Sequence, residues 1–369
     1  MIKVLEVIRQ GQIGGGESHL FDLVSLLNKE RICPICLSFT DGEMIRRLKE
    51  IGIDCHIINT EKPFDLNVQK SIKKLIQSEQ VDIIHAHGSR AASNVIWSAH
   101  QLHIPLIYTV HGWSFHDDQP TIIRKIRALS EKCICHYSKE VICVSQSNAD
   151  TGKKYFGLKK AHVIENGINL ERFNPKMKIE NLRPSMGMSE KDFIVGFIAR
   201  CTKQKNPIGF LKAVELAHRQ NPQIKGIFIG EGDMDPEVDS YIQSQSMDRY
   251  LYRSPFRTDV PELLHAINVY CLPSLWEGLS IALLEAMAME KAIIATPTDG
   301  TRELIQHDKN GYIVPFNDTQ ALADAIILLS KAPEKCIQYG ELARNLVEQR
   351  FNAYNVAEKV MRIYEYALS

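Results

Sequence analysis

The sequence has no excess of charge of either sign. Its 369 residues include 44 acidic and 44 basic side chains, so the formal net charge is zero. A protein that attracts nucleic acid through its overall field usually carries a strong positive charge. We therefore expect no nucleic-acid partner, and any anion site must be local.

Long apolar runs are also missing. A helix that crosses a bilayer needs about 18 or more consecutive apolar residues, and no run approaches that length. The apolar segment Ile2–Ile8 is too short for the core of a signal peptide and runs straight into glycines. This pattern predicts a cytoplasmic protein whose membrane contact would be peripheral.

Paired cysteine motifs and repeats are absent as well. The nine cysteines are single or in loose pairs, and neither Cys33 with Cys36 nor Cys133 with Cys135 has a second pair at zinc-finger spacing. Scattered cysteines of this kind indicate free, mostly buried thiols in a reducing compartment. No internal repeat or low-complexity segment is present.

Apolar strand-like runs alternate with helical patterns along the whole chain. This alternation predicts parallel sheets covered by helices on both faces, and the length suits two α/β domains. Functional residues of such sheets lie at the carboxyl ends of the strands. His87, His111 and Ser145 are expected at such ends.

The first unit of this alternation contains a glycine-rich turn. Ile2–Ile8 reads as a buried strand, glycines follow at 14, 15 and 16, and Ser18–Asn28 reads as an amphipathic helix. Glycines there allow close approach of a ligand to backbone amides. A dinucleotide site is an alternative, with Asp41 as its ribose-binding acid, although GQIGGG does not spell GxGxxG.

Two short motifs allow a metal interpretation. His85 and His87 share a face of their predicted strand, but a metal would need further ligands, so hydrogen-bonded strand-end histidines are the alternative. Asp233 and Asp235 form a DxD pattern, which binds a metal ion in some enzymes of other folds. Because Pro236 follows directly, we interpret these aspartates as residues at a helix N-terminus.

The stretch from Glu277 to Glu285 carries the strongest signal. A buried strand, Ile267–Leu272, should end at the following Pro-Ser, and Ser280 is a suitable N-cap for a helix through Met289. A helix N-terminus entered through Gly278 offers amides and a positive dipole end to a diphosphate, with a carboxylate on each side. The alternative is a capping loop glutamate plus a solvated helix glutamate.

A second group of charges precedes it. Arg200 follows the strand-like run FIVGFIAR, and Lys205 lies before the predicted helix Pro207–Arg219. Two cations at a strand end and a helix start could hold two phosphates, whereas a basic pair alone is usually surface.

The text PSLWEGLSIALLEAMA resembles the E-x7-E signature of retaining glycosyltransferases of family 4, written PSxxEGxxxxxxEAMA. The resemblance implies that Glu277 faces the transferred sugar and that Glu285 binds ribose hydroxyls. The backbone amides of Gly278, Leu279 and Ser280 would contact the sugar and phosphates.

Further segments are similar to the family in the expected order. The resemblance implies that Gly15 and Gly16 cover the donor phosphates, that His111 of HGWSF lies beside the donor sugar, and that Arg200 and Lys205 of RCTKQKN bind the diphosphate. It also implies that the base pocket includes Gly230, Ser254 and Phe256. In the NGIN segment, Asn169 replaces the family's aspartate.

The resemblance covers nearly the whole chain and implies two Rossmann-like domains facing across a cleft, the type-B glycosyltransferase fold. Residues 1–175 would bind the acceptor and residues 176–350 the nucleotide sugar, while residues 351–369 would form a helix that crosses back to the first domain.

The expected reaction moves a hexose-type sugar, with retention, from a nucleoside-diphosphate sugar to a hydroxyl of a glycan or polyprenyl-linked acceptor. The expected donor is a UDP-sugar, with a GDP-sugar as the other choice, and no cofactor or metal is expected. The resemblance and the basic stretch Thr121–Tyr137 suggest surface-polysaccharide or lipopolysaccharide synthesis at the inner face of the plasma membrane. A nucleotide-sugar epimerase and a non-catalytic glycan-binding protein are the alternatives.

Overall fold

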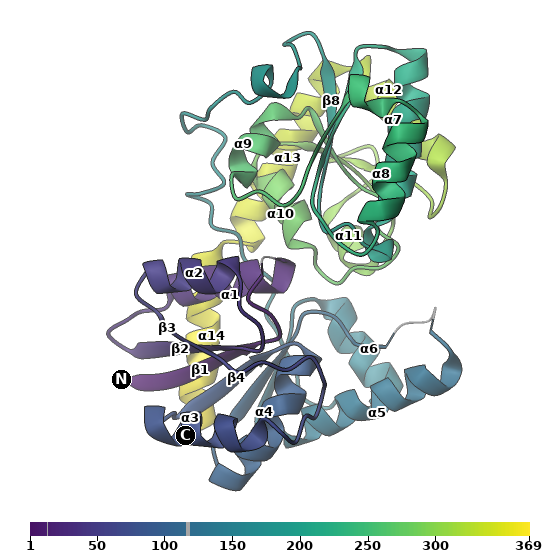
Figure 1. The fold of residues 1–369 in the computed structure, drawn as a ribbon. Coiled ribbons are helices and arrows are strands. Elements are labelled where there is room, and N and C mark those ends of the chain that lie inside the picture. The colour runs from purple at the N-terminus through teal and green to yellow at the C-terminus, as the bar shows by residue number, and fades with distance from the viewer. Residues whose placement is uncertain (13, 116–118) are drawn as a thin grey trace. The chain divides into compact units, whose positions relative to one another are not determined.

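The computed structural model describes residues 1–12, 14–115 and 119–369 and divides the chain into two compact units. Unit 1 comprises Met1–Gly167 and Ala353–Ser369, and unit 2 comprises Ile168–Asn352. Each unit is a parallel sheet with helices on both faces (Figure 1). Two Rossmann-like α/β units are therefore confirmed.

The sheet of unit 1 has the strand order β3-β2-β1-β4-β5-β6-β7. Its strands are β1 Ile2–Ile8, β2 Ile32–Ser38, β3 Asp54–Ile57, β4 Ile83–His87, β5 Leu106–Val110, β6 Glu140–Cys143 and β7 His162–Val163. Its helices are α1 Gly15–Leu26, α2 Glu43–Glu50, α3 Gln69–Glu79, α4 Ser89–Leu102, α5 Thr121–Tyr137, α6 Gln146–Phe156 and α14 Ala353–Leu368.

The sheet of unit 2 has the order β10-β9-β8-β11-β12-β13. Its strands are β8 Phe193–Ile198, β9 Ile224–Ile229, β10 Leu251–Ser254, β11 Val269–Leu272, β12 Ala292–Ala295 and β13 Tyr312–Ile313. Its helices are α7 Pro207–Gln220, α8 Asp235–Ser244, α9 Val260–Ala266, α10 Ile281–Ala288, α11 Asp299–Leu304, α12 Thr319–Ser330 and α13 Pro333–Arg350, with 3-10 turns at Pro184–Met186, Lys203–Lys205 and Met247–Arg249.

Alternation along the strands decides which helices cover each face. In β1, Leu5 and Val7 pack in one cluster with residues of α3 and α4, whereas Val4 packs in another with residues of α1 and α14. The C-terminal α14 (yellow in Figure 1) therefore covers the same face of the unit 1 sheet as α1.

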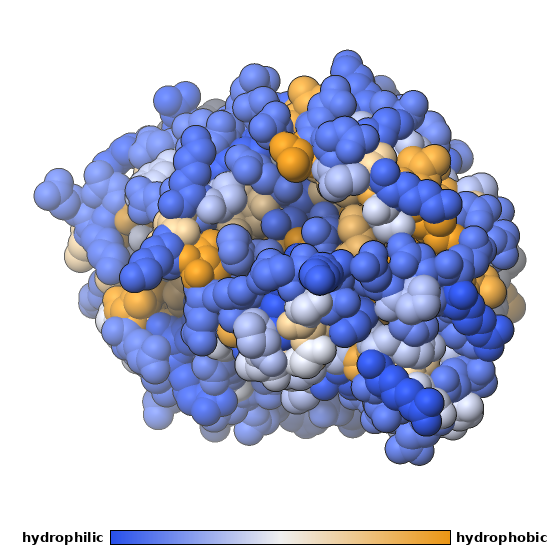
Figure 2. All heavy atoms as spheres, turned by 90° about the horizontal axis from the view of Figure 1, so that it is seen from above, coloured by the Kyte–Doolittle hydropathy of each residue, from blue (hydrophilic) through white to orange (hydrophobic). Residues whose placement is uncertain are grey.

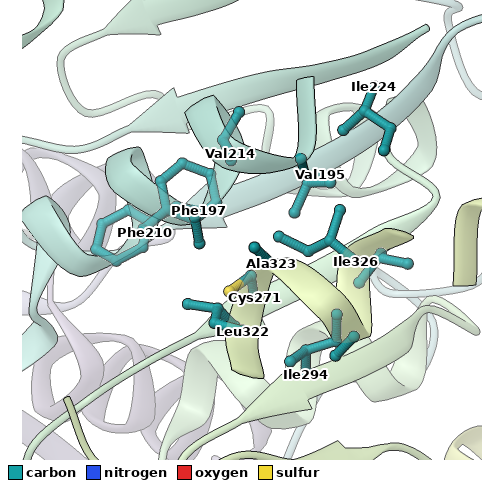
Figure 3. Close-up of a cluster of buried hydrophobic side chains, with 14 of the residues drawn as sticks. Val195, Phe197, Phe210, Val214, Ile224, Cys271, Ile294, Leu322, Ala323 and Ile326 are labelled. Atoms are coloured by element: carbon teal, nitrogen blue, oxygen red, sulfur yellow. The ribbon is translucent and has the colours of Figure 1, made fainter. Parts of the chain in front are cut away.

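The core of unit 2 is built in the same way. Phe197 of β8 stacks on Phe228 of β9 with ring centroids 4.6 Å apart, and Phe210 of α7 closes over both. Figure 3 shows this cluster continuing to Leu322 and Ile326 of α12. This packing fixes the sheet whose strand ends carry the expected donor residues.

The domain boundary differs from the prediction of 175. Ile168 forms a parallel bridge with Asn352, and the Arg344 side chain donates a hydrogen bond to the Phe173 carbonyl. Residues 168–175 therefore belong to unit 2, as do residues 351 and 352, while α14 belongs to unit 1. Asn169 accepts hydrogen bonds from the amides of Glu171 and Arg172, which makes it part of a turn at this junction.

Two elements also begin at other residues than predicted. Helix α1 begins at Gly15 rather than Ser18, because Gly14 is extended and Ser18 already donates to the Gly14 carbonyl. The strand before the glutamate pair begins at Val269 rather than Ile267. Ile13 of the glycine-rich loop lies outside the described residues.

None of the helices in the described part of the chain combines the length and apolar character needed to cross a bilayer. The face seen in Figure 2 is mostly hydrophilic, with small and separated hydrophobic patches.

Candidate active site

Both sheets have a point at which the strand order reverses. In unit 1 it lies between β1 and β4, and in unit 2 between β8 and β11. Connections on either side of such a point leave toward opposite faces, so the strand ends there form a natural ligand site. The expected site residues gather at the carboxyl ends of these strands and of their neighbours.

In unit 2, Lys205 and Glu277 form an ion pair. Both side chains are about nine-tenths buried, with 10% of the lysine and 8% of the glutamate exposed. Ser274 donates to Glu277 Oε1 at 2.8 Å, and Gln204 donates to the Trp276 carbonyl at 2.8 Å. The β8–α7 connection is thus joined to the β11–α10 loop, and Glu277 is held in one orientation.

The local sequence explains where the two glutamates lie. β11 ends before Pro273, and α10 begins after Ser280, so Glu277 is in the loop and Glu285 is on the helix. Ser280 occupies the N-cap position, but its side chain makes no capping hydrogen bond. The side chain of Ser280 therefore does not cap the amides that begin α10.

Gly278 is fixed by close backbone packing. A Cβ atom on Gly300, at the start of α11, would lie only 1.7 Å from the Gly278 carbonyl oxygen. Only a glycine at 300 permits this approach, which sets the path of the loop toward Leu279 and Ser280. Leu279 and Ser280 are themselves buried.

Both glutamates act on one buried tyrosine. Tyr270 of β11 is fully buried and donates its hydroxyl to the Ile198 carbonyl at 3.0 Å. Burial raises its pKa well above the ordinary value, and the charges of Glu285 and Glu277 raise it further. The two carboxylates therefore lie within electrostatic range of one point beneath the loop.

The two cations differ in their surroundings. Lys205 is buried in its ion pair, whereas Arg200, directly after β8 and Ala199, is exposed. Within residues 1–12, 14–115 and 119–369, no hydrogen bond or ion pair occupies the Arg200 guanidinium. It is therefore available to an anionic ligand in a way that Lys205 is not.

Gly230 and Ser254 lie side by side at the ends of β9 and β10, where the Gly230 amide donates to the Ser254 carbonyl at 3.1 Å. Gly230 has φ +141°, and a Cβ there would lie 1.8 Å from the Ala199 carbonyl oxygen. The glycine is thus required by strand packing, apart from any ligand. Phe256 follows β10 and is half-buried.

Asp235 begins α8, as the sequence predicts. It accepts a hydrogen bond from the Gly232 amide at 2.9 Å and pairs with Arg253 at 2.7 Å. These contacts give it a structural role at the helix N-terminus.

In unit 1, the glycine turn and His111 come together. Gly15 and Gly16 form the first turn of α1, and His111 follows β5 directly. A Cβ on Gly16 would lie 3.6 Å from His111 Cδ2, so the glycine backbone borders the imidazole ring.

His87 and His85 are hydrogen-bonded histidines at the end of β4. His87 Nδ1 lies 3.2 Å from His111 Nε2, and His87 Nε2 lies 2.9 Å from Glu6 Oε2. His85 contacts the hydroxyls of Tyr364 and Thr109, each at 2.7 Å.

Sequence reasoning did not single out Glu6, His19 and Tyr364. The available signals were a glutamate inside the apolar run IKVLEVI, a histidine in the first helix, and a tyrosine on the apolar side of the last helix. Each is ordinary when taken alone.

The fold matches those of solved structures along its full length. A crystal structure of the Anabaena protein HepE with UDP and glucose superimposes with a TM-score of 0.87 at 21% identity, covering 99% of this chain and 100% of that one. Staphylococcus aureus TarM matches with a TM-score of 0.81 at 13% identity, covering 99% and 100%. The fold is that of the type-B glycosyltransferases.

Sequence comparison specifies the family. The model described as "Glycosyl transferases group 1" matches residues 178–346, and the model "Glycosyltransferase Family 4" matches residues 13–172. EpsD of Bacillus subtilis strain 168, a glycosyltransferase by name, is 30% identical over 317 residues, which is 82% of each chain.

An Escherichia coli protein is also similar. It is named UDP-Gal:alpha-D-GlcNAc-diphosphoundecaprenol alpha-1,3-galactosyltransferase and is 25% identical over 306 residues, covering 81% of this chain and 78% of the relative. The chain belongs to glycosyltransferase family 4 and is a glycosyltransferase.

Proposed function

We propose that the chain transfers a hexose-type sugar, with retention of configuration, from a nucleoside-diphosphate sugar to a hydroxyl of a glycan or polyprenyl-linked acceptor. The supporting observation is the Lys205–Glu277 ion pair at the switch point of unit 2, beside the N-terminus of α10. We propose UDP as the nucleotide, because HepE was solved with UDP and glucose and the E. coli relative is named for UDP-Gal.

In this proposal, unit 2 binds the donor. Arg200 and the first amides of α10 contact the leaving diphosphate, and Lys205 adds positive charge beside it while paired with Glu277. Together they stabilise the negative charge that develops on the diphosphate, without a metal or cofactor. Glu277, oriented by Lys205 and Ser274, accepts hydrogen bonds from the sugar, and Glu285 accepts them from the ribose. The amides of Gly278, Leu279 and Ser280 contact the sugar and the phosphates.

The remaining positions complete the donor site. Gly230, Ser254 and Phe256 border the base, while Gly15 and Gly16 offer the amides of α1 to the phosphates. His111 contacts a hydroxyl beside the reacting carbon. No residue is assigned as a nucleophile, so the acceptor hydroxyl attacks from the face that the diphosphate leaves, and the leaving phosphate takes its proton.

The donor site is tested by calorimetry with UDP-, GDP- and ADP-sugars, with and without EDTA. We expect one UDP-sugar to bind equally well in both conditions, and Arg200→Ala to abolish that binding. Lys203→Ala is the matched control, because Lys203 is exposed in the same connection. Binding that requires a divalent metal, or binding unaffected by Arg200→Ala, would contradict the proposed site.

The two glutamates should separate in kinetics. Glu285→Ala should raise the Kd of the nucleotide by roughly tenfold or more, since it removes a bidentate contact to the ribose. Glu277→Ala should lower kcat by roughly 100-fold with a smaller change in donor affinity. If the two variants had the same donor affinity and the same rate, these assignments would be contradicted.

We also propose that unit 1 contacts the inner face of the plasma membrane through α5. This helix exposes Ile122, Ile126 and Leu129 at a helical spacing, with Lys125 and Lys132 also exposed. Apolar side chains beside lysines suit the surface of an anionic bilayer, where a polyprenyl-linked acceptor would lie.

Vesicle sedimentation tests this proposal. Binding to vesicles that contain anionic lipid should fall strongly in Ile126→Glu and rise with anionic lipid content. Ile337→Glu, which changes an equally exposed isoleucine on α13, is the control and should bind as the wild type does. Equal vesicle binding by Ile126→Glu and the wild type would exclude α5 as the membrane contact.

A further inference from the structure

The centre of unit 1 contains a carboxylate that the proposed reaction does not use. Glu6 of β1 is fully buried, and three groups surround its oxygens. The Tyr364 hydroxyl donates to Oε1 at 2.7 Å, while His87 Nε2 and His85 Nδ1 lie 2.9 Å and 3.2 Å from Oε2. A buried carboxylate is tolerated only when donors satisfy it, and each of these three groups can donate.

Glu6 is charged. Burial alone would raise the pKa of its carboxyl, but His85 and His87 hold that pKa well below its ordinary value. A carboxylate can only accept hydrogen bonds. Because Oε2 accepts, Nε2 of His87 must carry a proton.

The proton position on His87 determines the next one. Burial, followed by the nearby His85, lowers the pKa of His87 to about 4, so its ring is neutral at neutral pH. A neutral imidazole with a proton on Nε2 has an unprotonated Nδ1, which accepts. The atom facing it, at 3.2 Å, is Nε2 of His111, which must therefore be the donor.

The ring geometry supports a hydrogen bond between these histidines. The ring planes of His87 and His111 are only 21° apart, and their centroids are separated by 5.5 Å. The distance between the centroids is longer than the 3.2 Å between the two nitrogens by about two ring radii. The two nitrogens therefore lie close to the line that joins the centroids, and the rings are arranged end to end. His19, His87 and His111 each offer a nitrogen within 4.8 Å of the others, which makes a shared metal ion the competing arrangement.

We propose that Glu6 and His87 are positioning residues that hold His111 as its Nε2–H tautomer, with Nδ1 left as a hydrogen-bond acceptor for a substrate hydroxyl. Both hydrogen bonds then run in the same direction: His111 donates to His87, and His87 donates to Glu6. The tautomer is a property of unit 1 alone. The role of the Nδ1 lone pair toward a hydroxyl rests on the proposed function.

NMR of the full chain with ¹⁵N-labelled histidine tests the tautomer directly. Long-range ¹H–¹⁵N spectra at neutral pH should show a protonated Nε2 and an unprotonated Nδ1 for both His87 and His111, assigned with His87→Gln and His111→Gln. A proton on Nδ1 of His111, a doubly protonated ring, or one equivalent of tightly bound zinc in the purified protein would overturn the proposal. The wild-type spectrum decides this whether or not any variant folds.

Glu6→Gln tests the positioning role. An amide has one accepting oxygen and one donating NH₂, so it cannot satisfy three donors. We expect the His111 proton to redistribute toward Nδ1, and kcat to fall roughly tenfold or more while the KM for the donor changes little. Tyr364→Phe, which keeps the carboxylate, should leave the His111 tautomer as in the wild type.

Glu140→Gln is the matched control. Oε2 of Glu140, in β6, lies 2.7 Å from Nε2 of His162. These two residues form a second glutamate–histidine pair in the same sheet. It should leave both the His111 spectrum and kcat unchanged, and an effect equal to that of Glu6→Gln would overturn the proposal. The predicted spectrum without any sugar transfer would contradict the proposed function and leave the tautomer assignment intact.

Discussion

At Gly230, a requirement of the packing coincides with a ligand-binding role that is proposed for the same residue. Its amide pairs with Ser254, and the position of its missing Cβ is occupied by the Ala199 carbonyl. A ligand-binding role inferred from the family therefore adds to a requirement of the packing. A substitution there would first disturb the ends of β8 and β9.

Gly230→Ala should destabilise unit 2 by at least about 3 kcal/mol, because the residue has φ +141° and the new Cβ would force the backbone apart. Gly187→Ala is the control: Gly187 has φ +69° with open space around it, so only the left-handed penalty of roughly 1 kcal/mol applies. Chemical denaturation followed by hydrogen exchange of unit 2 measures both. Equal losses in the two variants would contradict the steric argument.

At the scale of single residues, sequence reasoning found those that belong to a recognisable sequence motif. Glu277 and Glu285 were placed correctly in a loop and on a helix because a proline and a helical apolar pattern surround them. Glu6 could not be found in this way. Its partners are 79, 81 and 358 residues away, and only the folded sheet brings His85, His87 and Tyr364 to it.

Among the elements, α14 shows how a segment distant in sequence completes a core. Its apolar side packs on β1, β4 and α1 through a cluster that includes Val356, Val360 and Met361. The amphipathic pattern of the tail predicted such a helix, and the family resemblance implied its partner. Periodicity alone does not say which sheet an apolar stripe covers.

Met361→Ala should destabilise unit 1 by about 2–5 kcal/mol, since the side chain is only 1% exposed and its loss leaves a cavity. Arg362→Ala, at the adjacent exposed position, should change the free energy of unfolding by no more than about 0.5 kcal/mol. Hydrogen exchange in β1 and α1 reports the loss locally. Unchanged protection there in Met361→Ala would contradict the packing of α14 on unit 1.

Element boundaries were harder to predict than element types. The strand–helix alternation was predicted from apolar runs, and both parallel sheets are confirmed. Gly15 and Gly16 were predicted to lie in a tight turn before the first helix, yet they form its first turn.

For the whole molecule, the predicted domain boundary at residue 175 differs from the boundary in the structure, which follows Gly167. The prediction used a change in composition, which marks a polar stretch, whereas a domain ends where the chain stops packing on one core and starts packing on the other. Ile168 and Phe173 contact Asn352 and Arg344, so the first crossing between units comes at Gly167 and the second at Ala353. Each unit therefore has its own core and its own ionisable groups, and the two can differ in response to pH.

Unit 1 should lose stability in acid before unit 2. Burial, followed by neighbouring histidines, lowers the pKa of His19 to about 3 and of His87 to about 4, below the ordinary value of 6.5. The unfolded chain then binds more protons than the folded one below pH 6.5. Each of these histidines removes up to about 1.4 kcal/mol of stability per pH unit as the pH falls toward its folded pKa.

Glu6 adds to this loss at lower pH, because its lowered pKa contributes stability above the ordinary value of 4.5 that is lost as the pH falls further. Hydrogen exchange between pH 7 and pH 4.5 should therefore show protection falling first in β1, β4 and β5. The strands of unit 2 in the same sample are the internal control. Among the described residues of unit 2, His265 is the one histidine whose pKa is lowered, and it is only partly buried. Earlier loss of protection in unit 2, or loss in both units at one pH, would contradict the assignment of neutral buried histidines to unit 1.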